Sequence, residues 1–276
     1  MRVCRIIILN VLIILACIPS RGQQPAPSAT PASSPVTVTP PANKDSFHLY
    51  LLMGQSNMAG RDIRGLAAQT TDPRVLAMTP EGQWVVAKDP IHQKDGRTEP
   101  GVGPGISFGL AMIKANPGVT IGLVPCAVGG TPLKRWQKKS GDLYERAVNR
   151  EKLAAQSGEI KGVLWLQGES DTDKQPSAER YEAGLSQMLQ DLRADLGQPN
   201  LPIVVGQIGE FLPQDKHPFV DTVRAAIRTI PGKVPHTGYA DSTGLGDQGD
   251  KLHFDAQGAR EMGARFAKAM QAIQKK

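Results

Sequence analysis

Apolar runs without polar alternation recur along the chain, and segments with helical spacing separate them. A run of this kind that ends at small residues is typical of a strand buried on both faces of a parallel sheet. Four runs stand out, at residues 49–53, 120–125, 162–167 and 203–208. Because amphipathic segments follow them, we predict an α/β domain with a doubly wound sheet in which strands are followed by helices.

The sequence pattern predicts the elements between these strands with different clarity. The clearest helix follows an N-cap at Ser177 and carries apolar residues on one face from Tyr181 to Leu196. Residues 72–97 are rich in Pro, Gly and charge, so we expect an irregular surface excursion over the site. Residues 238–240 predict a short fifth strand. Further helices are predicted over residues 106–115, 143–156 and 219–230 and in a closing segment that contains Met262 and Ile273.

The N-terminal region has the composition of an export signal followed by a tether. Arginines precede an apolar stretch that is too short to favour a membrane span, so we predict a secretory signal peptide over residues 1–22. A lipoprotein-type site that would place a lipid on Cys17 is the alternative. Residues 23–44 are rich in Pro, Ala, Ser and Thr and predict a disordered linker. Residues 45–276 then fit one domain of a secreted or periplasmic protein.

Charge and residue spacing argue against several classes of function. The formal charge of +6 falls to about +3 once the arginines of the signal peptide are removed, too little and too scattered to predict nucleic-acid binding. The histidines, and Cys126 as the thiol certain to remain in the domain, show no metal-ligand spacing. We therefore expect no metal, no cofactor and no nucleic-acid partner. The sequence predicts no particular oligomeric state.

Small and polar residues follow each strong strand, and in a parallel sheet these positions meet at one edge. Ser56 follows the first strand, Gly129 and Gly130 the second, and Gln167 and Glu169 the third. Taken alone, a serine at this position is more typical of a helix N-cap than of a nucleophile. Polar residues delivered to the same edge by other segments change that balance.

A serine hydroxyl becomes an effective nucleophile when a nearby base takes its proton. His253 lies just before the closing helix, and Asp250 can reach back to its ring within one turn. A carboxylate on the second ring nitrogen fixes the tautomer and stabilises the imidazolium. Backbone N–H groups at the Gly129-Gly130 turn and the Gln167 amide are candidate donors to a developing oxyanion. These residue types predict acyl transfer.

Four motifs in this order resemble the SGNH hydrolase superfamily. They are Gly54-Gln55-Ser56-Asn57, Gly129-Gly130-Thr131, Gln167-Gly168-Glu169-Ser170-Asp171 and Asp250-x-x-His253. Within the superfamily, the chain looks like the carbohydrate acetylesterases of the sialate O-acetylesterase and acetylxylan esterase (family 6) type. The resemblance implies a three-layer α/β/α, flavodoxin-like fold with a mostly parallel five-stranded sheet.

The resemblance also implies a role for each motif residue. Ser56 becomes the nucleophile and its own N–H an oxyanion donor. The Gly129-Gly130 turn supplies a second donor, and Gln167 stands where other superfamily members place Asn. His253 becomes the general base.

Some assignments stay open at this point. Gln-Gly-Glu replaces the usual Asn block, so either Asp250 or Glu169 is left as the carboxylate that supports the histidine. Gln55, Asn57, Arg61 and Trp136 are weaker candidates for substrate contact. For Arg61 an ion pair, and for Trp136 a place at the edge of the core, fit the sequence equally well.

Together these observations predict a secreted serine esterase that removes O-acetyl groups from carbohydrates through an acyl-enzyme. Acetylated xylan, sialic acid and related glycans are the expected substrates. The acyl-transfer half follows from the site residues, and the sugar half rests on the resemblance. The alternatives are a general short-chain esterase or thioesterase, and a non-catalytic carbohydrate-binding relative with the same fold.

Overall fold

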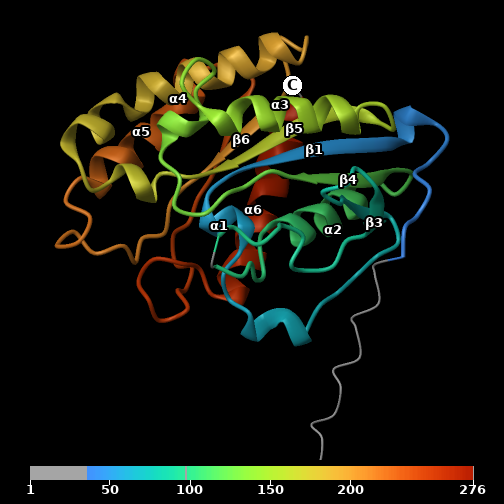
Figure 1. The fold of residues 1–276 in the computed structure, drawn as a ribbon, viewed down its shortest axis with the longest axis horizontal. Helices are drawn as coiled ribbons and strands as arrows, with labels where there is room; N and C mark the ends of the chain where they lie inside the picture. The colour runs from blue at the N-terminus through green and yellow to red at the C-terminus, as the bar shows by residue number, and fades with distance from the viewer. Residues whose placement is uncertain (1–35, 97, 276) are drawn as a thin grey trace, which may run out of the picture. The chain divides into compact units, whose positions relative to one another are not determined.

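A seven-stranded sheet forms the centre of the domain (Figure 1). The computed structural model describes residues 36–96 and 98–275. The order across the sheet is β3-β2-β4-β1-β5-β6-β7, and neighbouring strands are parallel except for the antiparallel pair β2 and β3. In chain order the strands are β1 (Phe47–Gly54), β2 (Val75–Met78), β3 (Trp84–Val86), β4 (Thr120–Pro125), β5 (Glu159–Leu166), β6 (Ile203–Gly206) and β7 (Thr237–Ala240).

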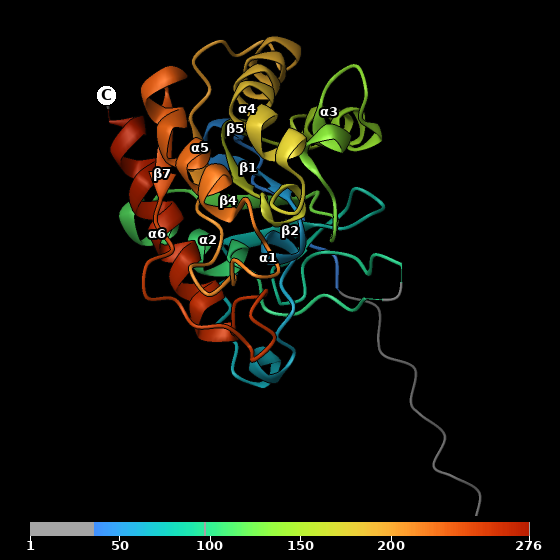
Figure 2. The same cartoon turned by 90° about the vertical axis from the view of Figure 1, so that its left-hand side faces the viewer.

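Helices cover both faces of the sheet and complete three layers (Figure 2). Helices α3, α4 and α5 pack on one face, and α2 and α6 pack on the other. The α-helices are α1 (Ser56–Ala59), α2 (Gly105–Ala115), α3 (Asp142–Ala154), α4 (Gln175–Asp195), α5 (Val220–Lys233) and α6 (Ala256–Gln274). Single 3₁₀ turns are η1 (Lys44–Ser46), η2 (Arg64–Ala67), η3 (Leu133–Trp136) and η4 (Glu169–Asp171).

The central strand β1 contributes side chains to the hydrophobic cores on both faces. Leu49, Leu51 and Met53 pack on the side of α3, α4 and α5, whereas Tyr50 and Leu52 pack on the side of α2 and α6. Successive strand side chains point to opposite faces, so a strand covered on both faces needs apolar residues at every position. All five are 0 % exposed. The uninterrupted apolar run therefore has the cause that the sequence predicted.

The predicted doubly wound topology is confirmed. The five expected strands are β1, β4, β5, β6 and β7, and their order in the sheet is the flavodoxin-like one. The chain passes from β1 to β4 on one side of β1 and then to β5 on its other side. The winding reverses between β1 and β5, and such switch points are where open α/β sheets bind ligands.

The strand count differs from the prediction, because two strands lie where we expected irregular structure. β2 pairs in parallel with β4, and β3 forms the edge of the sheet. The two strands have four and three residues. Pro80 and Gly82 stand in the turn that joins them. Apolar runs this short, interrupted by turn residues, are not separable from a loop by their pattern alone.

The predicted helices are present with small shifts at their ends. One of them concerns α4, which begins at Gln175 rather than after an N-cap at Ser177. Pro176 stands in its first turn. Proline is favoured there because its fixed φ suits a helix and its missing N–H has no acceptor to lose.

Part of the predicted linker contacts the domain. The N–H of Val38 donates to the carbonyl of Trp84 at 2.8 Å, and Thr37 bridges to Val85. An edge strand such as β3 has unpaired backbone groups, so an extended segment can pair with it. The predicted signal peptide, including Cys17, lies outside the described residues. In the part of the chain that the structure describes, no helix has the length and apolarity to cross a membrane.

Candidate active site

A cavity of about 570 Å³ opens where β1, β4 and β5 end. Its lining comes from segments far apart in the chain: the turn into α1, the loops after β3, β4, β5 and β6, and the turn before α6. The lining includes Ser56, Arg61, Asp95, Gly129, Glu169 and His253. The switch point of the sheet therefore coincides with the place where the sequence motifs meet.

Ser56 begins α1 directly after β1. The strand ends at Gly54, which has a φ of +137°, and a Cβ at this position would lie 2.0 Å from the carbonyl oxygen of Leu166 in β5. Only glycine fits so close an approach. The N–H of Gln55 then donates to the same carbonyl at 3.0 Å. This contact between β1 and β5 fixes the backbone immediately before Ser56.

His253 connects Ser56 to Asp250. Its Nε2 lies 3.0 Å from Ser56 Oγ, and its Nδ1 lies 2.6 Å from Asp250 Oδ2. Both distances are within hydrogen-bond range. If Nδ1–H donates to the carboxylate, Nε2 is left as an acceptor for the serine hydroxyl. The three side chains then form one hydrogen-bonded series that reaches the cavity.

The turn before α6 holds Asp250 in its ionised form. The N–H groups of Leu252 and His253 donate to Asp250 Oδ1 at 2.9 and 2.8 Å. Burial alone would raise the pKa of Asp250. Hydrogen bonds from His253, Gln248 and Leu252 outweigh burial and hold that pKa well below its usual range. A negative charge is thus maintained beside the imidazole.

Asn57 brackets His253 through the backbone on both sides of it. Its Oδ1 accepts from the N–H of Phe254 at 2.9 Å, and its Nδ2 donates to the carbonyl of Leu252 at 3.1 Å. The same Nδ2 donates to Glu169 Oε1. Asn57 is 3 % exposed and engaged on all sides by these groups. The structure therefore gives Asn57 a bracing position in place of the predicted contact with substrate.

Glu169 lines the cavity but makes no hydrogen bond with His253 in the described structure. It is 2 % exposed, and burial raises its pKa, an effect that the hydrogen bond from Asn57 opposes. Of the two carboxylates that the sequence left open, Asp250 is the one in contact with the imidazole. Hydrogen bonds connect Glu169 through Asn57 to the backbone beside His253.

The Gly129-Gly130 turn lines the cavity, but its first N–H already has an acceptor. The N–H of Gly129 donates to Asp95 Oδ2, and Arg61 Nη2 donates to the same oxygen at 3.0 Å. Arg61 therefore lies in the cavity wall and in an ion pair at the same time. The ion pair that the sequence allowed for Arg61 is present, and its contact with substrate stays a prediction.

Gln167 is directed into the protein interior. It is 0 % exposed, and its Nε2 donates to Asp171 Oδ2, to the Thr131 carbonyl and to Gln55 Oε1 at 2.6, 3.1 and 3.2 Å. Gln167 does not line the cavity, whereas Gln55 does. The structure thus makes Gln167 a link between the loops after β4 and β5, and its amide is not aimed at the predicted oxyanion position.

Trp136 lies in the core, which corrects its predicted contact with substrate. The side chain is 0 % exposed and packs edge-to-face on Trp165 with ring centroids 5.5 Å apart. Its Nε1 donates to Thr131 Oγ1 at 3.0 Å. With its single donor satisfied and its ring buried, Trp136 supports the loop after β4 from below.

Sequence reasoning missed Asp95 and the pair of His217 and Asp173, which also line the cavity. His217 Nδ1 lies 2.9 Å from Asp173 Oδ1. Asp95 lies in the segment that was predicted as irregular, and His217 and Asp173 lie in loops before helices. No strand precedes any of them directly, so the rule that placed Ser56 and Glu169 gave no signal.

A hydroxyl, an imidazole and an ionised carboxylate in hydrogen-bonded series can support nucleophilic attack on an ester. The flavodoxin-like sheet with this series at its switch point defines a hydrolase of the SGNH type. Residues 46–272 match the family model described as carbohydrate esterase, sialic acid-specific acetylesterase. The chain therefore belongs to this family of carboxylic ester hydrolases.

Known relatives share most of the length of the chain. A probable carbohydrate esterase of Arabidopsis thaliana is 34 % identical over 239 residues, which cover 80 % of this chain and 89 % of that protein. The crystal structure of an Arabidopsis thaliana protein aligns with a TM-score of 0.73 at 31 % identity and covers 83 % of this chain and 98 % of that chain. The crystal structure of NanS aligns with a TM-score of 0.69 at 17 % identity, covering 86 % and 99 %, a likeness of fold alone.

Proposed function

We propose that the chain is a secreted serine esterase that removes O-acetyl groups from carbohydrates through an acyl-enzyme formed on Ser56. Membership of the carbohydrate esterase family supports ester hydrolysis as the reaction and a carbohydrate as the substrate. The serine mechanism rests on one observation, the hydrogen-bonded series from Ser56 through His253 to Asp250 at the cavity. Secretion rests on the sequence of residues 1–22.

Acylation begins when Ser56 Oγ attacks the acetyl carbonyl carbon. His253 Nε2 takes the hydroxyl proton as the bond to carbon forms, and Asp250 stabilises the resulting imidazolium. The same proton then passes to the sugar oxygen as the bond between carbonyl carbon and sugar oxygen breaks. The products of this half are a free sugar hydroxyl and an acetylated Ser56.

Deacylation repeats these steps with water. Water attacks the acetyl carbon while His253 takes one of its protons. His253 then returns this proton to Ser56 Oγ as the bond between Oγ and the acetyl carbon breaks and acetate leaves. Both tetrahedral intermediates carry a negative oxygen that needs hydrogen-bond donors. We assign the N–H of Ser56 as one donor, since N–H groups in the first turn of a helix have no intrahelical acceptor.

Asn57 and Glu169 act on this chemistry indirectly. Asn57 fixes the backbone of Leu252 and Phe254, and His253 lies between them. Glu169 accepts from the Asn57 amide and so selects the amide orientation that presents Oδ1 to Phe254. We therefore treat both as positioning residues for His253.

Release of acetate from acetylated xylan, acetylated sialosides and an aryl acetate tests the function, with wild type and Ser56→Ala compared on each substrate. We expect release from at least one carbohydrate that exceeds the rate on the aryl acetate, and none by the variant. Faster turnover of the aryl acetate than of every carbohydrate would favour a general esterase. Equal rates for the two proteins would contradict the serine mechanism, and no release by either would favour a non-catalytic binding protein.

A further inference from the structure

A side-chain carboxylate occupies a point of the catalytic cavity where two hydrogen-bond donors converge. Asp95 Oδ2 accepts from the Gly129 N–H and from Arg61 Nη2. The Arg61 and Asp95 side chains are 6 % and 18 % exposed, so the contact is largely shielded from water. Hydrogen bonds between charged partners are strong in such surroundings.

We propose that Gly129 N–H and Arg61 form the binding site for the carbonyl oxygen of the ester, and that Asp95 fills this site in the free enzyme as an internal competitor. The inference rests on the proposed esterase function and extends it. Arg61 becomes a catalytic residue that contacts the reacting oxygen, and Asp95 becomes a group that substrate must displace.

The glycine at position 129 is what allows the two donors to converge. A Cβ there would lie 2.0 Å from Arg61 Nη2 and 2.6 Å from Asp95 Oδ2. A side chain would therefore separate the guanidinium from the backbone N–H. Arg61 is also anchored near its own backbone, because Nη1 donates to the Gly60 carbonyl at 2.8 Å. The donor pair is thus held in place on both sides.

The chemistry of the occupant identifies the chemistry of the site. A carboxylate oxygen is a negatively charged acceptor, as is the oxygen of the tetrahedral intermediate. Donors that hold the former are suited to stabilise the latter. Ser56, Arg61, Gly129 and Asp95 all line the same cavity, so the nucleophile and this oxygen site face one common space.

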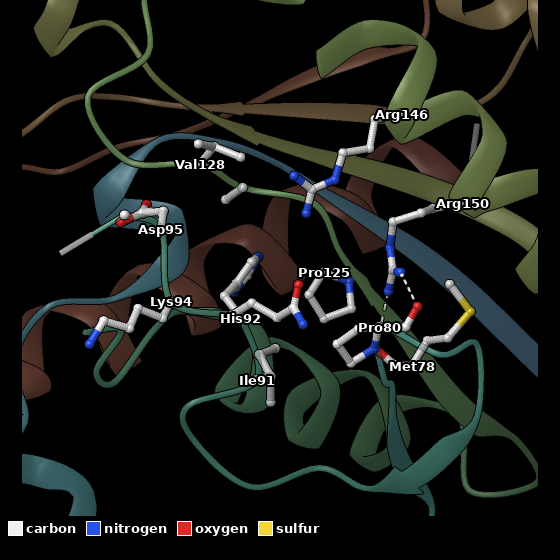
Figure 3. A pocket seen from close by; sticks show the side chains of 13 residues that line it. Met78, Pro80, Ile91, His92, Lys94, Asp95, Pro125, Val128, Arg146 and Arg150 are labelled. Carbon is white, nitrogen blue, oxygen red and sulfur yellow. Dashed lines mark hydrogen bonds between the residues drawn. The ribbon is translucent and has the colours of Figure 1, made fainter. Parts of the chain in front are cut away.

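The displaced carboxylate has a neighbouring cavity to enter. Asp95 also lines a second cavity of about 300 Å³, shown in Figure 3 together with His92, Arg146 and Arg150. Arg146 extends into this cavity and makes no ion pair with any residue that the structure describes. Burial lowers the pKa of His92 to about 3, so its ring is neutral and adds no charge. Arg146 can therefore receive Asp95 as a new partner.

An internal competitor has a defined kinetic consequence. When only a fraction of the free enzyme has an empty site, the apparent affinity for substrate falls by that fraction. The chemical step after displacement is unaffected. Removing Asp95 should therefore lower KM and leave kcat nearly unchanged, whereas removing Arg61 should lower kcat.

The test measures kcat and KM on an aryl acetate for wild type, Asp95→Asn and Asp95→Ala. We expect KM to fall roughly tenfold for Asp95→Ala and by less for Asp95→Asn, which keeps a neutral acceptor. Lys88→Ala is the matched control, because Lys88 is exposed and lines neither of the two cavities. Its KM should stay within about twofold of wild type. Arg61→Ala should lower kcat about 100-fold, as loss of an oxyanion donor does.

Acetate binding to the Ser56→Ala protein gives a readout that needs no turnover. By calorimetry, acetate should bind more tightly when Asp95→Ala is added and lose that gain when Arg61→Ala is added as well. An unchanged or higher KM for Asp95→Ala, or acetate affinity indifferent to Asp95, would overturn the inference even if the esterase mechanism holds. Failure of the mechanism itself would instead appear as activity that survives Ser56→Ala.

Discussion

The catalytic cavity has two walls that differ in how completely they are assembled. The His253 wall, formed by Ser56, Asp250 and His253, is joined in one hydrogen-bonded series and braced from behind by Asn57. The Asp95 wall, formed by Arg61, Asp95 and Gly129, has its donors occupied by its own carboxylate. The side chains of the His253 wall already have the arrangement that the proposed reaction needs. In the Asp95 wall, we propose that the Asp95 carboxylate is displaced before an ester can bind.

The difference separates the expected effects of mutation. Changes in the His253 wall should act on kcat, because its groups take part in proton transfer or position those that do. In the Asp95 wall, loss of Asp95 should act on KM and loss of Arg61 on kcat, whereas changes in the interior behind this wall should act on stability. Two buried residues, His92 in the lining of the second cavity and Glu151 in α3, have polar side-chain atoms without a hydrogen-bond partner in the described structure.

The largest effect is expected from the two residues that exchange the proton. Ser56→Ala and His253→Ala should each lower kcat by roughly 10⁴-fold or more, and the double variant should be little worse than either, because residues that act as one unit are far from additive. Initial rates on an aryl acetate measure all three variants. If the two losses multiply in the double variant, Ser56 and His253 do not act as one catalytic unit, and the proposed series is wrong.

The two carboxylates should differ in which property they affect. Asp250→Asn should lower kcat by up to about 10⁴-fold with little change in Tm, because the imidazole loses its orienting acceptor. Glu169→Gln should retain more activity and lower stability by roughly 1–3 kcal/mol, because a buried acceptor of the Asn57 amide is altered. Parallel measurement of kcat and Tm decides. If Glu169→Gln is inactive and Asp250→Asn is active, Glu169 rather than Asp250 is the carboxylate that orients His253.

Asn57 should show the signature of a positioning residue. Asn57→Ala removes both contacts that bracket His253 and should lower kcat about 10–100-fold, since small misplacements of a catalytic group are costly. KM should stay near the wild-type value, because Asn57 does not line the cavity. A rise in KM with unchanged kcat would return Asn57 to the substrate contact that the sequence suggested.

Glu151 should make stability depend on pH. Burial raises its pKa to about 8, above the ordinary carboxyl value, so the folded protein keeps a proton that the unfolded chain has lost. Stability from this group is therefore complete at acid pH and declines as pH rises toward 8. Glu151→Gln should raise Tm by about 5 °C at pH 8 and have little effect at pH 4.5.

The exposed Glu145 on the same helix provides the matched control, and Glu145→Gln should leave Tm unchanged at both pH values. If Glu151→Gln has the same Tm as wild type at pH 8, the ionised Glu151 carboxylate is stabilised by another group in the folded protein, which contradicts the prediction.

The smallest effect is expected from chelators. The proposed mechanism uses the side chains of Ser56, His253, Asp250 and Arg61 and backbone donors, so EDTA should leave kcat and KM unchanged. If EDTA abolishes activity and a divalent ion restores it, the reaction needs a metal ion, and the proposed mechanism is incomplete.

Sequence patterns predicted the His253 wall because its information is local. Asp250 and His253 are three residues apart in one turn, and Ser56 follows an unmistakable buried strand. The Asp95 wall was not predicted, because Arg61 and Asp95 are 34 residues apart and Asp95 lies outside any strand. The pairing of such residues depends on how long loops fold over the sheet.

Residue type alone also misplaced several side chains. Gln167 and Trp136 occupy positions close to the site in sequence, but the interior satisfies their donors instead. A sequence does not distinguish a polar side chain whose donor is satisfied in the interior from one that is exposed in a cavity. β2 and β3 were missed for a related reason, since two short strands gain their stability by pairing with β4 and with each other.

Labelling with a serine-directed aryl phosphonate tests the central claim most directly, because it reports the nucleophile itself. We predict that inactivation follows attachment of one phosphonyl group to the peptide that carries Ser56. Labelling should be much slower in His253→Ala and absent in Ser56→Ala. Inactivation with the label on another residue, or an unlabelled enzyme that still hydrolyses aryl acetates in the presence of the reagent, would contradict this claim.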